Sequence, residues 1–310
     1  MTSAQKPIRK KNAIVVCCTP GWLPLAAATL NFCAIHGAKE IADFFVMTFG
    51  TREAEPKEFN QFLTDKHIEA EVHVVDLTKE LKQVKSGRFS TATLLRLTLN
   101  KFIPKSYDRV LYLDCDVLPL APLDELFATN MHGKPIAAVE DYVSLSGPMT
   151  MFKDHPREIG MKPQSRYFNA GIILFNWPQV LTNGHLEKAL TTIVAAQNNN
   201  RNLPFLDQDV LNLEFENNWH ALPSKYNLMT FMLPYNSDQP IFRHFNSRNK
   251  PWGKTWIPEI SDYKKFYIEV FSDSSYASIA KKNFVAFSVF EIHEYFMRKF
   301  ALFSKLRLLN

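Results

Sequence analysis

An α/β fold built on a parallel sheet is predicted by two features of this 310-residue sequence. Short apolar runs rich in β-branched residues alternate with helix-like stretches, which is the pattern of parallel strands joined by right-handed crossovers. One run, 109–113, stops at two carboxylates one residue apart, and open α/β sheets bind ligands at the carboxyl ends of their strands. Hydrophobic residues make up 46% of the chain, enough for a large core in one or two domains.

The elements are expected in the following order. A strand at 13–18 is followed by a turn at Thr19-Pro20-Gly21 and a helix through 25–32. The stretch 140–166 has no sustained periodicity, and a loop of that length is usually functional or mobile. The further strands that we expect are 44–49, 72–75, 109–113, 136–139, 172–175 and 241–245. The further helices are 56–66, 94–102 with a start at 90–93, 122–127 and 185–197.

The overall composition favours a chain that remains in the cytoplasm. The formal charge is +5 and the pI is near 8.9, which suits anionic partners such as nucleotides, phosphorylated sugars or acidic lipids and does not indicate nucleic-acid binding. The run 13–18 is too short for a signal-peptide core, and no run of about 18 apolar residues exists to span a membrane. Cys17, Cys18, Cys33 and Cys115 show no zinc-binding spacing, so reduced structural thiols are expected.

Asp114 and Asp116 follow an apolar strand, and Pro119 soon prevents further strand pairing. Two carboxylates this close repel each other, and a cation with oxygen ligands, such as Mg²⁺ or Mn²⁺, offsets the repulsion. The alternative is a turn with two solvated acids, because Asp favours turns. The same letters fit the Asp-x-Asp-x-Val motif of haloacid-dehalogenase-like phosphatases. Cys115 is either a catalytic thiol or a structural residue. Alternation along the chain favours the structural residue, because it points Cys115 away from both acids.

Three later motifs carry residues suited to a site. Ala170-Gly171 either lets backbone or a ligand approach closely or marks a bulge in the following strand. Asp207 is either a helix N-cap or a site residue, and the N-cap hypothesis leaves Gln208 unexplained. His244 ends a short strand and precedes Lys250 in a polar loop, so these two residues are candidates for metal or phosphate binding.

Five motifs occur along the chain in the following order: Ser90 to Leu99 with Arg96, Tyr112 to Asp116, Phe168-Asn169-Ala170-Gly171, Asp207 to Asn212, and His244-Phe245 through Lys250-Pro251-Trp252. Together they resemble glycosyltransferase family 8 over roughly residues 12 to 256. A phosphatase would instead carry its Asp-x-Asp on the first strand with a downstream Gly-Asp pair, whereas here the motif falls on about the fourth strand and no Gly-Asp pair exists. The resemblance implies a GT-A type, Rossmann-like nucleotide-sugar-binding fold and a retaining transferase that uses a UDP-hexose with Mn²⁺.

The resemblance also implies roles for individual residues. Because Gln208 is an amide and a poor nucleophile, we expect front-face attack, with the leaving phosphate helping to deprotonate the acceptor hydroxyl. A covalent intermediate would need a carboxylate on the opposite face, and Asp209 is the candidate. The implied metal ligands are Asp114, Asp116 and His244; the nucleotide-sugar-binding residues are Trp22, Arg96, Cys115, Asn169, Ala170, Ser247 and Lys250; and the catalytic candidates are Gln208, Asp207 and Asp209.

Two positions depart from the family pattern. The family usually has Asp-Asp-Asn-Tyr after the first strand, where this chain has Thr19-Pro20-Gly21-Trp22. Trp22 can still stack on a base, but the acid that reads the base edge is absent, which leaves base preference open. Ser247 stands at the usual glycine position, where a side chain crowds the backbone that should approach the diphosphate. Either change implies an altered donor preference or reduced activity.

The last 30 residues predict a basic amphipathic helix. Val285, Val289, Ile292 and Phe296 recur on one helical face, and the segment from residue 281 holds six Lys or Arg against two Glu. Such a helix lies on an anionic membrane surface or docks on the protein's own core. We therefore expect a GT-A catalytic domain at 1–256 and a helical C-terminal extension at 257–310, peripheral on the inner membrane face.

These observations predict a metal-dependent hexosyltransferase. It would move galactose or glucose from a nucleotide sugar to a glycan or lipid-linked saccharide such as lipopolysaccharide, with Mn²⁺ or Mg²⁺ as cofactor. The alternative is a non-catalytic nucleotide-sugar-binding or scaffold protein of the same fold, prompted by the altered first and last motifs. The presence of Asp114, Asp116, His244, Asp207 and Gln208 argues against it, because a chain without the chemistry has no need of the full set.

Overall fold

A seven-stranded sheet forms the centre of the protein. The computed structural model describes residues 10–50, 54–76, 84, 91–141, 154–230, 239–247, 249–253 and 258–279. Within these, the strand order is β3-β2-β1-β4-β7-β6-β8. The strands are β1 (Asn12–Cys17), β2 (Ala42–Thr48), β3 (Ala70–Val74), β4 (Arg109–Leu113), β6 (Ile136–Glu140), β7 (Phe168–Asn176) and β8 (His220–Ala221).

The sheet is parallel except at β7. Strands β1 to β4 pair in parallel, as the alternation of apolar runs and helices predicts. β7 runs antiparallel to both of its neighbours, β4 and β6, so the expectation of a wholly parallel sheet is wrong there. All but the last residue of β7 are buried. A strand buried on both faces has a continuous apolar pattern whether it pairs in parallel or antiparallel. Its apolar run therefore carries no signal of its orientation.

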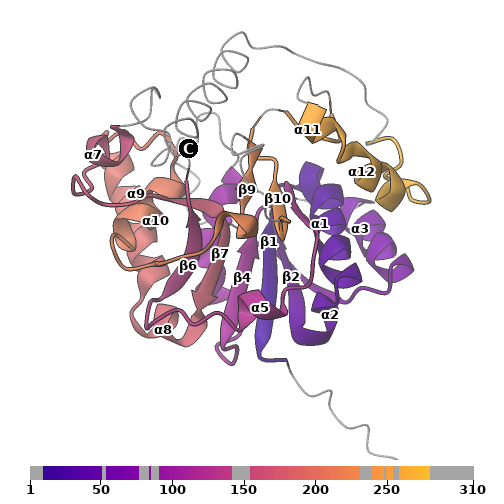
Figure 1. The fold of residues 1–310 in the computed structure, drawn as a ribbon, viewed down its shortest axis with the longest axis horizontal. Helices are drawn as coiled ribbons and strands as arrows, with labels where there is room; N and C mark the ends of the chain where they lie inside the picture. The colour runs from indigo at the N-terminus through magenta and orange to yellow at the C-terminus, as the bar shows by residue number, and fades with distance from the viewer. Residues whose placement is uncertain are drawn as a thin grey trace, which may run out of the picture.

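Helices cover both faces of the sheet (Figure 1). Along β1, Ile14 and Val16 pack with one set of helices, whereas Ala13 and Val15 pack with the other. This alternation follows from the two-residue period of a strand. The first set is α1 (Leu23–Ile35), α3 (Ala54–Asp65) and α12 (Lys264–Phe271). The second set is η2 (Thr91–Lys101), α8 (Trp177–Thr182), α9 (His185–Asn198) and α10 (Asp207–Glu214).

A second, three-stranded sheet in the order β5-β10-β9 adjoins the end of β4. Its strands are β5 (Val117–Pro119), β10 (Phe242–His244) and β9 (Leu228–Met229). Only 114–116 separate β4 from β5, so the two acids occupy the corner between the sheets. β10 pairs antiparallel with β5 and places His244 opposite Val117. This pairing brings His244, distant in sequence, to the corner that holds the acids.

Some of the shorter elements fall at predicted positions, and others were not predicted. The stretch expected as a helix near 94–102 is the 3-10 helix η2, and its expected start at Ser90 lies outside the described residues. The loop expected at 140–166 contains the short α7, with 142–153 also outside them. The remaining short elements are η1 (Pro20–Trp22), α2 (Ala38–Ile41), α5 (Asp124–Phe127), α7 (His155–Glu158), η4 (Ser224–Tyr226) and α11 (Pro258–Ser261).

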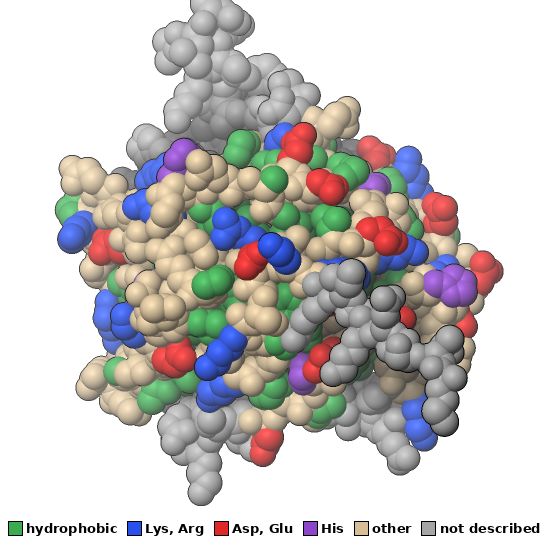
Figure 2. All heavy atoms as spheres, turned by 90° about the horizontal axis from the view of Figure 1, so that it is seen from below, with side chains coloured by type: hydrophobic (Ala, Val, Ile, Leu, Met, Phe, Trp, Pro, Cys, Tyr) green, Lys and Arg blue, Asp and Glu red, His purple; other side chains and the backbone are tan. Residues whose placement is uncertain are grey.

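The end of the described chain packs on the main core. Tyr267 of α12 meets Phe32 of α1 edge to face, with ring centroids 5.7 Å apart, so 258–279 share the core of the sheet. The expected amphipathic helix from residue 281 lies outside the described residues. Among the helices described, none combines the length and apolar character that crossing a membrane requires. On the face seen from below, acidic and basic side chains are mixed (Figure 2).

Candidate active site

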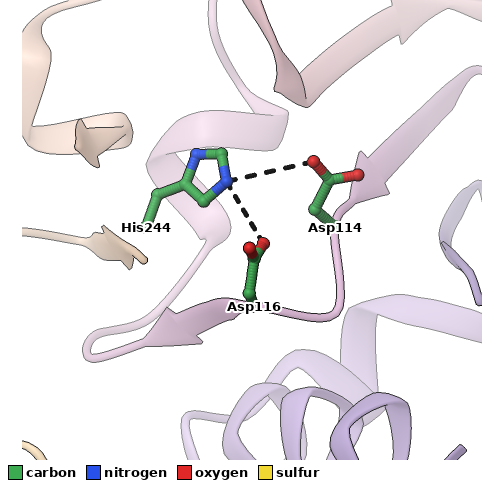
Figure 3. A group of neighbouring side chains, drawn as sticks. All are labelled: Asp114, Asp116 and His244. Atoms are coloured by element: carbon green, nitrogen blue, oxygen red, sulfur yellow. Dashed lines mark ion pairs between the residues drawn. The ribbon is translucent and has the colours of Figure 1, made fainter. Parts of the chain in front are cut away.

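Asp114, Asp116 and His244 converge at the corner between the two sheets (Figure 3). One ligand atom from each lies within 4.8 Å of the others. Nε2 of His244 is 3.2 Å from Oδ1 of Asp116 and 3.9 Å from Oδ2 of Asp114. Two carboxylates and one imidazole form a donor set that suits Mn²⁺ or Mg²⁺ when water or phosphate oxygens complete the coordination.

Gly171 makes the convergence sterically feasible. Its carbonyl oxygen accepts the backbone N–H of Asp114 at 2.8 Å, which continues the β4–β7 pairing past Leu113. A Cβ on Gly171 would lie 2.2 Å from Cε1 of His244 and 2.9 Å from Oδ2 of Asp114. The small residue predicted to allow close approach therefore faces the acids and the histidine directly.

Asn227 orients the imidazole of His244. Its side-chain oxygen lies 2.9 Å from Nδ1 of the ring, so Nδ1 carries the proton and Nε2 presents its lone pair to the two acids. The amide nitrogen of Asn227 donates in turn to Oδ1 of Asn169 at 2.9 Å. Oδ1 of Asn169 also accepts the N–H of Gly171 at 3.0 Å, which fixes the orientation of that amide as well.

The charge around Asp116 also fits a cation site. Burial alone would raise the pKa of this carboxyl, but the nearby charge of the Lys250 ammonium opposes burial, and the pKa lies well below its usual range. Nζ of Lys250 is 2.6 Å from Oδ2 of Asp116. Oδ1 of Asp116 is buried and has no hydrogen-bond donor among the described residues. A buried carboxylate oxygen without a donor, beside an imidazole nitrogen, is an environment that suits a metal ligand.

Arg96 links the acid pair to α10. Its guanidinium is buried and lies 2.9 Å from Oδ1 of Asp114 and 2.8 Å from Oδ2 of Asp207. It also donates to the carbonyl oxygen of Ala170 and stacks over Tyr112, with 4.4 Å from its central carbon to the ring centroid. Burial raises the pKa of Asp207 to about 6, although Arg96 opposes the shift. One buried cation is thus shared between two acids.

Asp207 does not cap α10, so the N-cap alternative is wrong. The residue before the helix is Leu206, and Asp207 is the first helical residue with its carboxylate on Arg96. The side-chain oxygen of Gln208 accepts the backbone N–H of Ala170 at 3.0 Å. Its amide nitrogen donates to Oδ2 of Asp141 at 3.3 Å. The structure therefore brings Asp207 and Gln208 to the residues around Asn169 and Arg96.

Asp141 is a site residue that the sequence interpretation missed. It is buried, and Oδ2 accepts hydrogen bonds from Asn169 at 2.8 Å and from Gln208. β6 is antiparallel to β7, which is antiparallel to β4, so Asp141 and Asp114 follow strands that end at the same edge of the sheet. An acid directly after an apolar strand was the available signal, as it was for Asp114.

Trp22, Lys250 and Trp252 form a second cluster beside Asp116. The two tryptophan rings meet at right angles with centroids 6.1 Å apart. Nζ of Lys250 lies 6.0 Å from the centroid of Trp22 and 5.9 Å from that of Trp252. Trp22 is 37% exposed, so an aromatic face, an ammonium and the acid pair adjoin one another. The hydroxyl of Ser247 accepts the N–H of Asn249 at 3.1 Å within the loop that leads to Lys250.

Two of the candidate residues point elsewhere. Asp209 is fully buried, and its oxygens interact with His155, Tyr167 and the backbone N–H of Phe205. Cys115 lies at the corner between the acids but packs against the hydrophobic core. Burial raises the pKa of its thiol well above the usual range. The alternation argument that turns Cys115 away from both acids therefore agrees with the structure.

Comparison with known proteins points to one family. Residues 13–255 match the sequence profile of glycosyl transferase family 8. Glycosyltransferase GlyA of Streptococcus pneumoniae is 27% identical over 78% of this chain and 32% of its own length. Lipopolysaccharide 1,3-galactosyltransferase of Salmonella typhimurium is 26% identical over 68% of this chain and 63% of its own length. The chain thus spans about a third of one relative and under two thirds of the other.

The fold has counterparts among solved structures. The galactosyltransferase LgtC, solved with donor and acceptor sugar analogues, superimposes with a TM-score of 0.69 at 21% identity. The superposition covers 85% of this chain and 96% of LgtC. This similarity confirms the α/β fold of GT-A type. Because the family profile extends over most of the sequence, from the first strand to beyond Lys250, the chain belongs to glycosyl transferase family 8.

Proposed function

We propose that this chain is a metal-dependent retaining hexosyltransferase. The donor would be a nucleotide sugar, UDP-galactose or UDP-glucose, and the acceptor a glycan or glycolipid such as lipopolysaccharide. The observation that carries the proposal is the Asp114–Asp116–His244 cluster, whose imidazole Nε2 is presented to the acids by the contact of Nδ1 with Asn227. The names of the relatives support a sugar-transfer reaction.

In this proposal, different residues bind different parts of the donor. A divalent ion held by the cluster would supply Lewis-acid charge to the departing nucleoside diphosphate. Lys250 adds a point charge to the same oxygens, since its ammonium lies beside Asp116. Trp22 offers an exposed ring on which a base can stack. Arg96, Asn169 and Ala170 surround the sugar position in this proposal.

Gln208 is the group that we place nearest the anomeric carbon. Its amide is a poor nucleophile, so the acceptor hydroxyl attacks from the face that the diphosphate leaves, and the leaving phosphate takes the proton. Asp209 would be the nucleophile of a covalent alternative. Its full burial and three hydrogen-bonding partners favour the front-face route.

The test is nucleotide release from a panel of sugar nucleotides in the presence of Mn²⁺, Mg²⁺ or EDTA. We expect slow hydrolysis of a UDP-hexose that requires the metal and is lost in Asp116→Ala. Binding of each donor is measured beside release, because some transferases hydrolyse poorly without an acceptor. If no donor is released and none binds with metal, the proposal fails and the non-catalytic scaffold alternative replaces it.

We also propose that the C-terminal tail binds an anionic membrane surface, which would bring the site to a lipid-linked acceptor. The support is the basic amphipathic pattern from residue 281. Truncation after Phe284 should release the chain from vesicles that contain an anionic phospholipid, while neutral vesicles serve as the control. Equal binding of the truncated and full chains to anionic vesicles would contradict the proposal.

A further inference from the structure

The turn that carries Asp207 and Gln208 is strained at Leu206. Leu206 has φ 47° and ψ −111°, a combination that glycine adopts readily and a residue with a Cβ rarely does. It is the second residue of a tight turn in which the N–H of Gln208 donates to the carbonyl oxygen of Phe205 at 3.0 Å. Such strain persists only where surrounding contacts hold the backbone in place.

Asp209 makes contacts that hold this turn. Its Oδ2 accepts the backbone N–H of Phe205 at 2.8 Å, across the strained residue. Its Oδ1 accepts the hydroxyl of Tyr167 at 2.6 Å and lies 2.7 Å from Nε2 of His155. The exposed fractions are 0% for Asp209 and Tyr167 and 2% for His155. We call these three residues, His155, Tyr167 and Asp209, the Asp209 clamp.

Aromatic packing reinforces the Asp209 clamp. The His155 ring meets Tyr167 and Phe205 edge to face, with centroids 5.4 and 4.7 Å away. His155 belongs to α7, Tyr167 directly precedes β7, and Phe205 is in the turn itself. Ile159, directly after α7, and Phe168, at the start of β7, both belong to the sheet's second core, so the carboxylate ties the turn to a rigid support.

Tyr167 also connects the Asp209 clamp to Gln208. The phenol donates to Asp209, and the side chain of Gln208 hydrogen-bonds to the same hydroxyl. The Gln208 amide is held from its other side by the N–H of Ala170 and by Asp141. Because Gln208 lies in this turn, the conformation of the turn sets where its amide meets these partners.

We propose that the Asp209 clamp holds the Leu206 turn in its strained conformation and thereby positions Asp207 and Gln208 for sugar transfer. Asp209 is then a positioning residue that acts through the backbone of the turn and through Tyr167. The inference rests on the proposed function for its consequence in catalysis. The structural part of the inference is that the conformation of the turn depends on the Asp209 clamp. This part can be tested without an activity assay.

The first test compares thermal stability. Leu206→Gly and Leu206→Ala both remove the side chain, but only glycine relieves the backbone strain. We expect the glycine variant to unfold at a higher temperature than the alanine variant by at least about 2 °C. Tyr167→Phe removes one contact of the Asp209 clamp, so in that background we expect the turn to relax. The difference in unfolding temperature between the glycine and alanine variants should then shrink toward zero. An equal difference with and without Tyr167→Phe overturns the proposal.

A matched control removes a similar hydrogen bond elsewhere. Tyr107 is also buried, and its hydroxyl donates to Oδ2 of Asp43 at 2.8 Å, at a different part of the sheet. In a Tyr107→Phe background we expect the full difference between Leu206→Gly and Leu206→Ala. If Tyr107→Phe abolishes the difference as Tyr167→Phe does, the effect is general loosening and the proposal is overturned.

The second test measures transfer or hydrolysis of the donor. We expect Tyr167→Phe to lower kcat by about tenfold or more with little change in KM for the donor. Adding Leu206→Gly should restore part of kcat, whereas Leu206→Ala should not. Full kcat in Tyr167→Phe, or a glycosyl adduct found on Asp209 by mass spectrometry, overturns the proposal. If the unaltered chain neither binds nor turns over any nucleotide sugar, the proposed function fails, and the stability comparison still decides the structural part.

Discussion

The side-chain oxygen of Asn227 lies 2.9 Å from Nδ1 of His244 and leaves Nε2 of the ring facing Asp114 and Asp116. This contact couples the small sheet to the site, because Asn227 directly precedes β9 and His244 ends β10. Hydrogen-bond partners of metal-binding histidines fix the tautomer, and their loss weakens metal binding. Asn227 is therefore expected to matter for metal affinity without touching the metal.

Replacing Asn227 should show whether metal affinity depends on the orientation of the His244 ring or only on packing around it. Asn227→Leu keeps the approximate size but removes the acceptor, and we expect Mn²⁺ affinity to fall by about 10- to 100-fold. Asn227→Asp keeps an acceptor for Nδ1 and should retain affinity. Isothermal titration with Mn²⁺ in the presence of UDP measures both. Equal affinities in the leucine variant and the unaltered chain would contradict the role assigned to this contact.

Gly171→Ala should disturb the site by direct steric conflict. The added methyl group would lie 2.2 Å from Cε1 of His244, and no real structure holds such a contact. His244 or β7 must shift, so we expect Mn²⁺ affinity and donor turnover to fall by about tenfold or more. Gly21→Ala is the control for metal affinity, because a Cβ there meets nothing within 4 Å. Similar affinities in the two alanine variants would exclude the steric explanation.

Arg96 should contribute to stability as well as to the site. Arg96→Met leaves Asp114 and Asp207 without their shared cation, and losing one partner of a buried ion pair costs about 3 to 5 kcal/mol of unfolding free energy. Lys11 pairs with Asp108 at 3.8 Å with both side chains largely exposed, so Lys11→Met should cost no more than about 1 kcal/mol. Urea unfolding of both variants tests the contrast. Equal losses would show that burial of Arg96 does not govern its contribution.

The buried thiols give a prediction about pH. Burial raises the pKa of Cys17, Cys18 and Cys33, that of Cys18 to about 12. An unfolded thiol ionises near 8.5, so above that pH the unfolded chain has lost protons that the folded chain keeps. Stability must therefore fall as pH rises from about 8.5 toward 12. Urea unfolding at pH 8 and pH 10 should show a smaller fall in a Cys18→Ala variant than in the unaltered chain.

The same burial predicts slow thiol modification. At pH 8 iodoacetamide should leave Cys17, Cys18 and Cys33 unmodified in the folded chain and label all three after unfolding in urea. Peptide mass spectrometry assigns the label to each position. Rapid labelling of any of the three without denaturant would contradict their placement in the core.

The candidate site residues that were easiest to predict from the sequence are the acids that directly follow a strand. Asp114 and Asp116 were identifiable because an apolar strand stops at them, and the family motifs added His244 and Gln208. Asp141 follows another strand at the same edge, directly after Glu140, and was missed because no family motif marks it. Its importance depends on β6 running parallel to β4, which requires knowledge of the sheet order.

The remaining misses concern long-range geometry. The antiparallel direction of β7 leaves no trace in a run that is buried on both faces. Asn227 lies in a polar stretch near a two-residue strand, and only the β9–β10 pairing brings it to His244. The positive φ of Leu206 is invisible in the sequence, because glycine would be the expected residue there.

The most direct measurement of the central claim is electron paramagnetic resonance of free Mn²⁺ during titration with the protein in the presence of UDP. The account predicts that the unaltered chain depletes the free-ion signal at micromolar protein and that Asp116→Ala and His244→Ala do not. Depletion that is the same in all three chains, or absent from the unaltered chain, would contradict a metal and nucleotide site at Asp114, Asp116 and His244.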